Sequence, residues 1–157
     1  MPLIMVPQDI DAKLSARVDH AAEALRDFYL RSHRLMDRIM TAKGASFARS
    51  RLLMHIARTT MTRSIDIASS FGYAPRTVTE AIDGLERDGL VCRHPDPDDR
   101  RAKRIALTPA GAAAAEAAEG SKREYLEKVF SVLDDEERGE IVRLIGKLNA
   151  RLAELER

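Results

Sequence analysis

The stretch GLERDGLVCRHPDPDDRRAKRIALTPAG, residues 84–111, decides the fold of this chain. Two short apolar runs, at 90–94 and 103–107, flank the charged segment PDPDDRRA, and this order predicts a β-hairpin with a long tip. Thr108 then stands where it can cap a helix whose first position is Pro109. The charged tip fits either a solvated turn or a loop that reaches a highly charged partner.

The segment upstream of the hairpin, SIDIASSFGYAPRTVTEAIDGLE, predicts two helices at roughly 64–71 and 75–88. The turn between them contains Gly72, and Pro75 falls in the first turn of the second helix, where its missing N–H costs nothing. A short helix, a glycine turn and a second helix form a helix-turn-helix. With the hairpin behind it, the arrangement is a winged helix.

Long helices are predicted on both sides of this motif. From residue 9 to residue 40, apolar and small side chains recur at alternating steps of four and three until Gly44 interrupts the pattern. Such a seam is long enough to pack against the helix of a partner chain. Its members are Leu14, Val18, Ala21, Leu25, Phe28, Ser32, Leu35 and Ile39.

Shorter elements complete the predicted order. A second amphipathic helix is expected at 46–58, and the spacer TTMTR after it is too short for more than one strand. The alanine-rich helix that starts at Pro109 should run to about residue 132. Asp134 is a predicted N-cap, with Glu137 completing a capping box for a final helix. That helix presents Ile141, Leu144, Ile145, Leu148, Leu152 and Leu155 on one face.

Composition narrows the class of protein. The 157 residues carry a formal net charge of +1, so global charge does not argue for a nucleic-acid, membrane or acidic partner. The bases are concentrated in the middle of the chain, because residues 49–76 hold five arginines against Asp66 alone. Residues 112–157 hold eleven acids and eight bases.

Cysteine and histidine usage argues against metal sites and catalysis. The one cysteine, Cys92, excludes an intrachain disulfide and a thiolate cluster, and the four histidines show no ligand spacing. We see no Cys–His or Ser–His–Asp grouping, so we expect no enzyme, no metal and no cofactor. The N-terminus lacks a basic leader, and no run of about 18 apolar residues occurs. We therefore expect a soluble, cytoplasmic protein.

The spacing of residues within 84–111 resembles the signature of the MarR family of bacterial transcription regulators. That pattern begins with Gly-Leu-Val, continues after seven residues with Asp-Arg-Arg, and ends after six more with Thr-x-x-Gly. The chain has Gly89-Leu90-Val91, Asp99-Arg100-Arg101, Thr108 and Gly111 at this spacing. The similarity extends upstream through the helix-turn-helix and more loosely over nearly the whole chain.

The resemblance implies that the hairpin tip enters the DNA minor groove. Arg101 would be the inserted residue, and Asp99 would pair with it and fix its direction. A guanidinium suits the narrow, negative minor groove, which agrees with this role. Arg100, Lys103 and Arg104 are candidate phosphate contacts, and such contacts give affinity and register but little sequence information.

The second helix of the motif would be the recognition helix, with its N-terminal residues at the bases of the major groove. Its candidate DNA contacts are Ala74, Pro75, Arg76, Thr77, Thr79 and Glu80. Arg76 is suited to guanine, and the two threonines to phosphates or thymine methyl groups, although both also fit plain helix surface. Relatives often carry Ser where this chain has Ala74 and a base where it has Glu80, which weakens the expected phosphate contacts.

The resemblance also implies a fold class, a domain division and an oligomeric state. The class is mostly α with a small β-wing, in which a winged helix-turn-helix DNA-binding lobe joins a helical dimerisation region. Residues 1–45 would form the N-terminal dimerisation helix, 46–110 the DNA-binding domain and 111–157 the C-terminal dimerisation helices, in one compact two-lobed protomer. The homodimer would act as a repressor on a pseudo-palindromic double-stranded DNA operator.

Many relatives release DNA when a small, often aromatic, acid binds where the dimer helices meet the DNA-binding lobe. Here a second stripe beside the seam, together with the following helix, would line such a pocket. The candidates are Tyr29, His33, Met36, Met40, Met54 and His55. The same residues at helical spacing also fit an ordinary core.

Two alternatives stay open. A redox or metal sensor would use Cys92, whose neighbours Arg93 and His94 could lower its thiol pKa, or the histidines. A half-buried strand residue is the simpler interpretation of Cys92. An interaction module that has lost DNA binding would explain Ala74 and Glu80.

Overall fold

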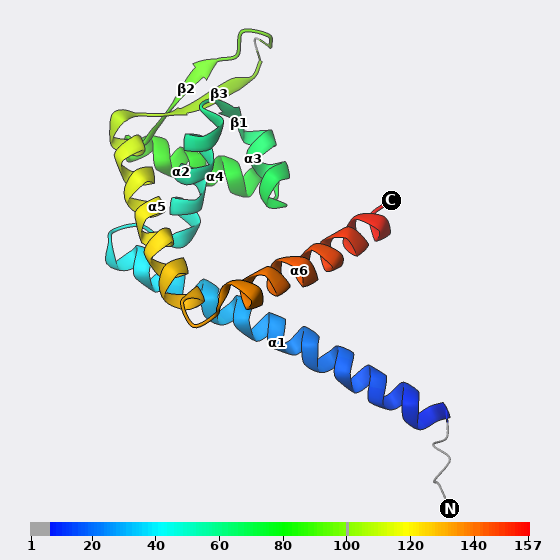
Figure 1. Ribbon diagram of the computed structural model, residues 1–157. Helices are drawn as coiled ribbons and strands as arrows, with labels where there is room; N and C mark the ends of the chain where they lie inside the picture. Colours follow the sequence, from blue (N-terminus) through cyan, green and yellow to red (C-terminus); the bar gives the residue numbers. More distant parts are fainter. Residues whose placement is uncertain (1–6, 100) are drawn as a thin grey trace, which may run out of the picture. The chain divides into compact units, whose positions relative to one another are not determined.

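The computed structural model describes residues 7–99 and 101–157, with side chains from residue 17 onward (Figure 1). Its elements run in the order α1 Pro7–Ala42, α2 Phe47–Thr59, β1 Thr62–Arg63, α3 Ser64–Phe71, α4 Pro75–Arg87, β2 Val91–Pro95, β3 Lys103–Leu107, α5 Pro109–Phe130 and α6 Asp135–Leu155. The chain divides within α2 into two compact units, residues up to 52 and residues from 53. This mostly helical winged helix-turn-helix confirms the predicted fold class.

The N-terminal unit is built on α1, which runs two residues past each predicted end and stops before Gly44, where φ is 96°. Asp37 Oδ1 accepts the N–H of Phe47 at 2.9 Å, which satisfies a free amide at the start of α2. The ring of His33 packs edge-on against Phe47, with centroids 5.2 Å apart. These contacts fix the turn from α1 into α2.

The helix-turn-helix of the second unit follows its local signals. Gly72 takes a left-handed conformation at φ 64°, and the N–H of Tyr73 returns to the carbonyl of Ala68 at 3.0 Å. This closure ends α3 and releases the chain into α4, with Pro75 at the first helical position. The apolar face of α4 is then fully buried through Val78, Ile82 and Leu85.

The wing is a three-stranded antiparallel sheet in the order β1-β3-β2. Strands β2 and β3 pair from Val91 opposite Leu107 to Pro95 opposite Lys103, as the predicted hairpin requires. The TTMTR spacer supplies β1, whose Arg63 lies opposite Arg104 of β3. Figure 1 shows the β2–β3 hairpin projecting beyond α3 and α4. The wing therefore carries its tip outward from the helix-turn-helix.

The base of the wing, where β2 begins and β3 ends, accounts for Gly89, Thr108 and Gly111 of the sequence signature. Thr108 Oγ1 donates to the carbonyl of Gly89 at 2.6 Å and accepts the N–H of Gly111 at 3.0 Å, which confirms the predicted cap of α5. A Cβ on Gly111 would lie 1.8 Å from the carbonyl oxygen of Leu90. Glycine is required there because backbone passes against backbone. These residues fasten the hairpin to α5.

Helices α5 and α6 end the chain. Asp134 and Glu137 form the predicted capping box, with bonds of 2.8 and 2.9 Å. Helix α6 buries no residue within this single chain, and its apolar face is exposed. The exposed members include Ile141, Leu144, Leu148, Leu152 and Leu155. Within the described residues, no helix is long and apolar enough to cross a membrane.

Candidate nucleic-acid interface

The loop end of the wing, beyond the Pro95–Lys103 pair, is organised by one buried carboxylate, that of Asp96, whose side chain has no exposed surface. Its Oδ2 accepts Nε of Arg63 at 2.7 Å and Nε of Arg104 at 2.9 Å. Its Oδ1 accepts the backbone N–H groups of Asp98 at 2.9 Å and Asp99 at 3.3 Å. The guanidinium of Arg104, and then that of Arg63, hold the pKa of Asp96 well below its usual range.

This cluster was missed by the sequence analysis. An aspartate whose side chain binds the amides two and three residues on is a local turn signal, and Asp-Pro-Asp-Asp at 96–99 displays it. The partnership with Arg63 spans 33 residues, so no local pattern reveals it. Arg63, one of the five arginines at 49–76, joins the start of α3 to the wing.

The wing tip contains the two residues that the family resemblance singles out. Asp99 and Arg101 are both exposed, and the bond between them runs from the Arg101 backbone N–H to Asp99 Oδ1 at 2.9 Å. The carboxylate thus shapes the turn, whereas the expected pairing was with the guanidinium. Arg100 lies outside the described residues. Arg101 extends from a tip whose backbone is held by Asp96 and Asp99.

The two predicted phosphate contacts on β3 differ in their surroundings. Lys103 is exposed at the first residue of the strand. Arg104 is held by Asp96 and also donates Nη2 to Asp98 at 2.9 Å. A phosphate at Arg104 would compete with two carboxylates, so the geometry favours an internal role for this arginine.

A second link joins the wing to the recognition helix. Arg93 of β2 donates to Asp83 at 2.5 Å and also to Glu86, both on α4. Its side chain is three-quarters buried, so this forked contact is shielded from solvent more than a surface pair. The contact fixes the strand against the helix.

The outward face of α4 carries the predicted base-reading residues. Arg76 Nε donates to Glu80 Oε1 at 2.8 Å, and the side chains are 89% and 64% exposed. Val78 lies buried on the opposite face of the same turn. The predicted Arg76 and Glu80 therefore act as one ion pair on the free surface of the helix.

The other predicted residues of α4 cluster at its first turn. Ala74 is the N-cap and supplies no side-chain bond to the helix. Pro75 occupies the first helical position, and its carbonyl accepts Oγ1 of Thr79 at 3.0 Å. That bond turns the Thr79 hydroxyl toward the backbone, which favours the thymine-methyl alternative over phosphate. Thr77 is exposed.

The predicted effector residues do not form one cluster within the units. In the N-terminal unit Tyr29 is exposed with its ring 6.1 Å from that of His33, while Met36 and Met40 are buried. In the second unit, Met54 faces α5 but the ring of His55 lies tilted against that of Phe71, with centroids 5.1 Å apart. Burial, and then the charge of Arg58, lower the pKa of His55.

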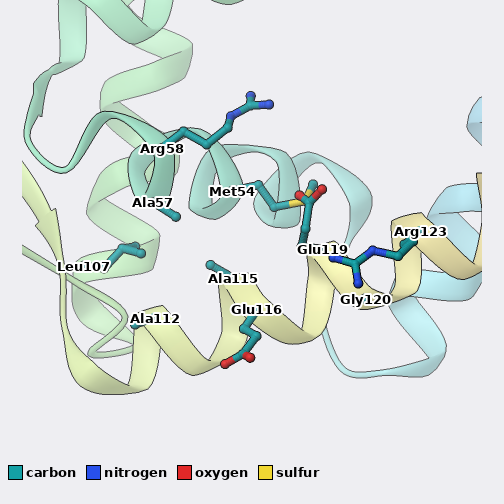
Figure 2. Close-up of a pocket in the computed structure, with 10 residues that line it drawn as sticks. All are labelled: Met54, Ala57, Arg58, Leu107, Ala112, Ala115, Glu116, Glu119, Gly120 and Arg123. Atoms are coloured by element: carbon teal, nitrogen blue, oxygen red, sulfur yellow. The ribbon is translucent and has the colours of Figure 1, made fainter.

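A cavity of about 710 Å³ lies between the second half of α2 and α5 (Figure 2). Met54 and Glu119 are directed toward each other there, one from each helix. The bond from Lys122 Nζ at 2.8 Å lowers the pKa of Glu119. The lining consists of Met54, Ala57, Arg58, Leu107, Ala112, Ala115, Glu116, Glu119, Gly120 and Arg123. The cavity combines an apolar floor with charges of both signs.

Cys92 is half-buried on β2, as the simpler interpretation expected. Its Sγ lies 3.2 Å from Nε2 of His94 and 3.7 Å from the carbonyl of Ala106. Within the described residues, no three His, Cys, Asp or Glu side chains are grouped so as to hold a metal ion.

Comparison with known proteins identifies the fold and the motif together. Residues 48–103, from α2 to the start of β3, match the model of the MarR family. This matched segment, which holds the helix-turn-helix and β2, is similar to the MarR family. The match supports a DNA-binding transcription regulator, as the wing signature predicted, rather than an enzyme.

Individual relatives are similar to most of the chain and not only to this segment. The chain is 29% identical to the uncharacterized HTH-type transcriptional regulator YwhA of Bacillus subtilis, over 87% of this chain and 96% of that one. It is 27% identical to the HTH-type transcriptional repressor YetL of the same organism, over 83% and 79%. A mutant MarR from E. coli complexed with operator DNA shares the fold, with a TM-score of 0.76 and 19% identity over 84% and 95% of the two chains.

Proposed function

We propose that this protein is a homodimeric MarR-family repressor that binds a pseudo-palindromic operator and releases it when a small molecule binds. The observation that carries the DNA-binding part is the pairing of an anchored wing with an exposed recognition helix in one unit. The relative YetL is named as a repressor, and MarR from E. coli was crystallised with operator DNA.

The DNA contacts would be divided between the two elements. Arg101 at the wing tip would enter the minor groove, with Lys103 contacting phosphate beside it. The first turn of α4 would enter the major groove, where Arg76 meets a base edge, Thr77 contacts phosphate or thymine methyl, and Thr79 contacts thymine methyl. Free amides at the Ala74–Pro75 end of α4 would contribute a further attraction to phosphate.

The dimer proposal rests on apolar helix faces left uncovered in the single chain. In α1, Val18 is 61% exposed and Phe28 48% exposed. In α6, the apolar stripe from Ile141 to Leu155 is exposed except at the half-buried Ile145. Burying such stripes against a second copy is the usual way to remove them from water. Sedimentation velocity should give a dimer mass, and Leu148→Glu combined with Leu152→Glu should shift it to the monomer.

The effector proposal rests on the cavity between α2 and α5. Its volume of about 710 Å³ falls within the range of small-molecule sites. An apolar floor with Arg58 and Arg123 at hand suits an aromatic acid, although Glu119 counters their charge. Small acids that release DNA should lose potency in Ala112→Leu, which fills the cavity from α5. Unchanged potency would place the effector elsewhere.

Fluorescence anisotropy tests the function as a whole. One labelled duplex carries DNA from upstream of the protein's own gene, and the other is a scrambled control. Binding to each is measured at salt concentrations from about 50 to about 200 mM. We expect much tighter binding to the upstream DNA, and both affinities should fall steeply with salt. A folded dimer that binds neither duplex even at low salt would refute DNA binding and favour the interaction module.

Redox control is a second candidate, favoured by the contact of Cys92 with His94. The Sγ of Cys92 lies 3.2 Å from Nε2 of His94, so a polar group adjoins the sulfur that an oxidant would attack. Peroxide treatment followed by mass spectrometry should then show oxidised Cys92 together with weakened DNA binding. An unmodified thiol, or unchanged binding after oxidation, would exclude this control.

A further inference from the structure

We infer that Glu80 is a positioning residue that holds Arg76 in register to read one guanine in each operator half-site, trading affinity for sequence discrimination. This inference rests on the proposed operator binding and adds the specificity of the recognition helix. Three features support it: the position of the pair on α4, the atoms that the ion pair uses, and the charge environment of the first turn.

The pair occupies the face of α4 that points away from the core. Val78 is fully buried, and Arg76 and Glu80 lie two residues before and two residues after it. Two residues turn an α-helix by about 200°, so both side chains lie on the face opposite Val78. Ile82, on the buried face, is also fully buried. Since Arg76 is 89% exposed in the first turn, its side chain is free to reach a groove that receives the N-terminal end of α4.

The ion pair leaves the base-reading edge of the arginine open. Glu80 Oε1 accepts Nε of Arg76 at 2.8 Å. A guanidinium has five N–H donors in a rigid fork, so engaging Nε leaves the end formed by Nη1 and Nη2. That end matches the O6 and N7 acceptors of guanine in a bidentate contact. Adenine offers N7 as an acceptor but a donor at its neighbouring position, so it would be rejected.

The charge of Glu80 sets the balance between affinity and specificity. The first turn of α4 contains no acidic residue, and its positive end attracts any phosphate. Glu80 neutralises Arg76 and repels phosphate, so Arg76 gains little from a nonspecific backbone contact. At the matching guanine, the same carboxylate restricts the arginine rotamers and lowers the entropy cost of binding.

The experiment measures base preference separately from affinity. Wild-type protein first selects duplexes from a library with a random core, and single-base variants of the best duplex are then titrated by anisotropy at one salt concentration. Replacing the guanine read by Arg76 should cost wild type about 5- to 150-fold. Arg76→Ala should abolish that penalty at one position per half-site. Arg76→Lys should keep the salt dependence of wild type yet also lose the preference.

Glu80→Gln distinguishes positioning from simple repulsion. We expect it to bind all duplexes several-fold more tightly while its penalty at the same guanine falls several-fold. Arg87→Ala, in the last turn of α4, is the matched control and should keep the full penalty. An equal gain on every duplex with the guanine penalty intact would overturn the positioning role. Failure of wild type to select any duplex would instead refute operator binding itself.

Discussion

The wing and the recognition helix both present arginines, but they hold them in opposite ways. In the wing, Asp96 is buried and gathers Arg63 from β1 and Arg104 from β3, and Arg101 extends from the resulting frame. In α4, Arg76 is paired one turn along the same helix with the exposed Glu80. The wing is thus fixed by contacts between distant segments, and the helix surface by contacts between neighbours.

This difference has energetic consequences. An exposed i,i+4 pair contributes only a few tenths of a kcal/mol and is weakened by salt, so the Arg76–Glu80 pair adds little to the stability of the fold. Losing one partner of a buried network leaves charges without compensation and is costly. We therefore expect the wing to be preformed and the outer face of α4 to be adaptable.

The largest expected effect lies at the base of the wing, where Gly111 passes Leu90. Gly111→Ala places a Cβ 1.8 Å from the Leu90 carbonyl oxygen, and backbone on both sides cannot move away easily. We expect a loss of about 1–3 kcal/mol or more in the free energy of unfolding, measured by urea denaturation. Gly120→Ala, in open space on the same helix, is the control and should be neutral or slightly stabilising. Equal stability of the two variants would contradict the close approach.

The next effect separates the wing tip from its neighbours. Arg101→Ala should lower operator affinity by about tenfold or more, because minor-groove insertion is lost, while the far-UV spectrum and the dimer stay intact. Lys103→Ala should weaken all duplexes by a smaller, similar factor and reduce the salt slope by about one. If Arg101→Ala behaves like Lys103→Ala in anisotropy titrations, the tip makes only phosphate contacts.

The contrast also explains which features the sequence could predict. The Gly72 turn, the Thr108 cap, the Asp134 capping box and the hairpin depend on neighbouring residues, and each was predicted correctly. The cluster at Asp96 depends on pairing across 33 residues, and the fit at Gly111 on two backbones that meet only in the fold. For the predicted effector set, helical spacing alone could not show that Met54 and His55 of the second unit face different neighbours.

A pH experiment sharpens the role of the Asp96 cluster. Because the folded pKa of Asp96 is depressed, its contribution to stability is fully present above the ordinary carboxyl range and is lost as pH falls through that range and below it. Between about pH 8 and about pH 5, Asp96→Asn should have a lower Tm than wild type. This difference in Tm should become smaller below about pH 4. The variant should also weaken operator binding, since the wing tip loses its anchor.

Asp98→Asn provides the matched control for that experiment. The Asp98 side chain is 76% exposed and contacts Arg104 alone among the described ion pairs. We expect a small, nearly pH-independent change in Tm, as for other exposed pairs. A gap for Asp96→Asn that stays constant into acid would mean that packing, and not ionisation, is what the aspartate contributes.

The smallest effect tests whether α4 is as adaptable as its surface suggests. Ala74 occupies the N-cap with extended backbone but no side-chain oxygen, so Ala74→Ser should add a bond to a free amide and stabilise the protein by about 0.5–1 kcal/mol. Ala110→Ser, beyond the N-cap of α5, should not stabilise in the same urea titration, because Thr108 already caps that helix. The serine at 74 could also meet phosphate, raising affinity for operator and scrambled DNA by the same small factor. An affinity gain for the operator alone would instead mean that the serine at the N-cap of α4 makes a sequence-specific contact. This end of the helix would then be held as firmly as the wing.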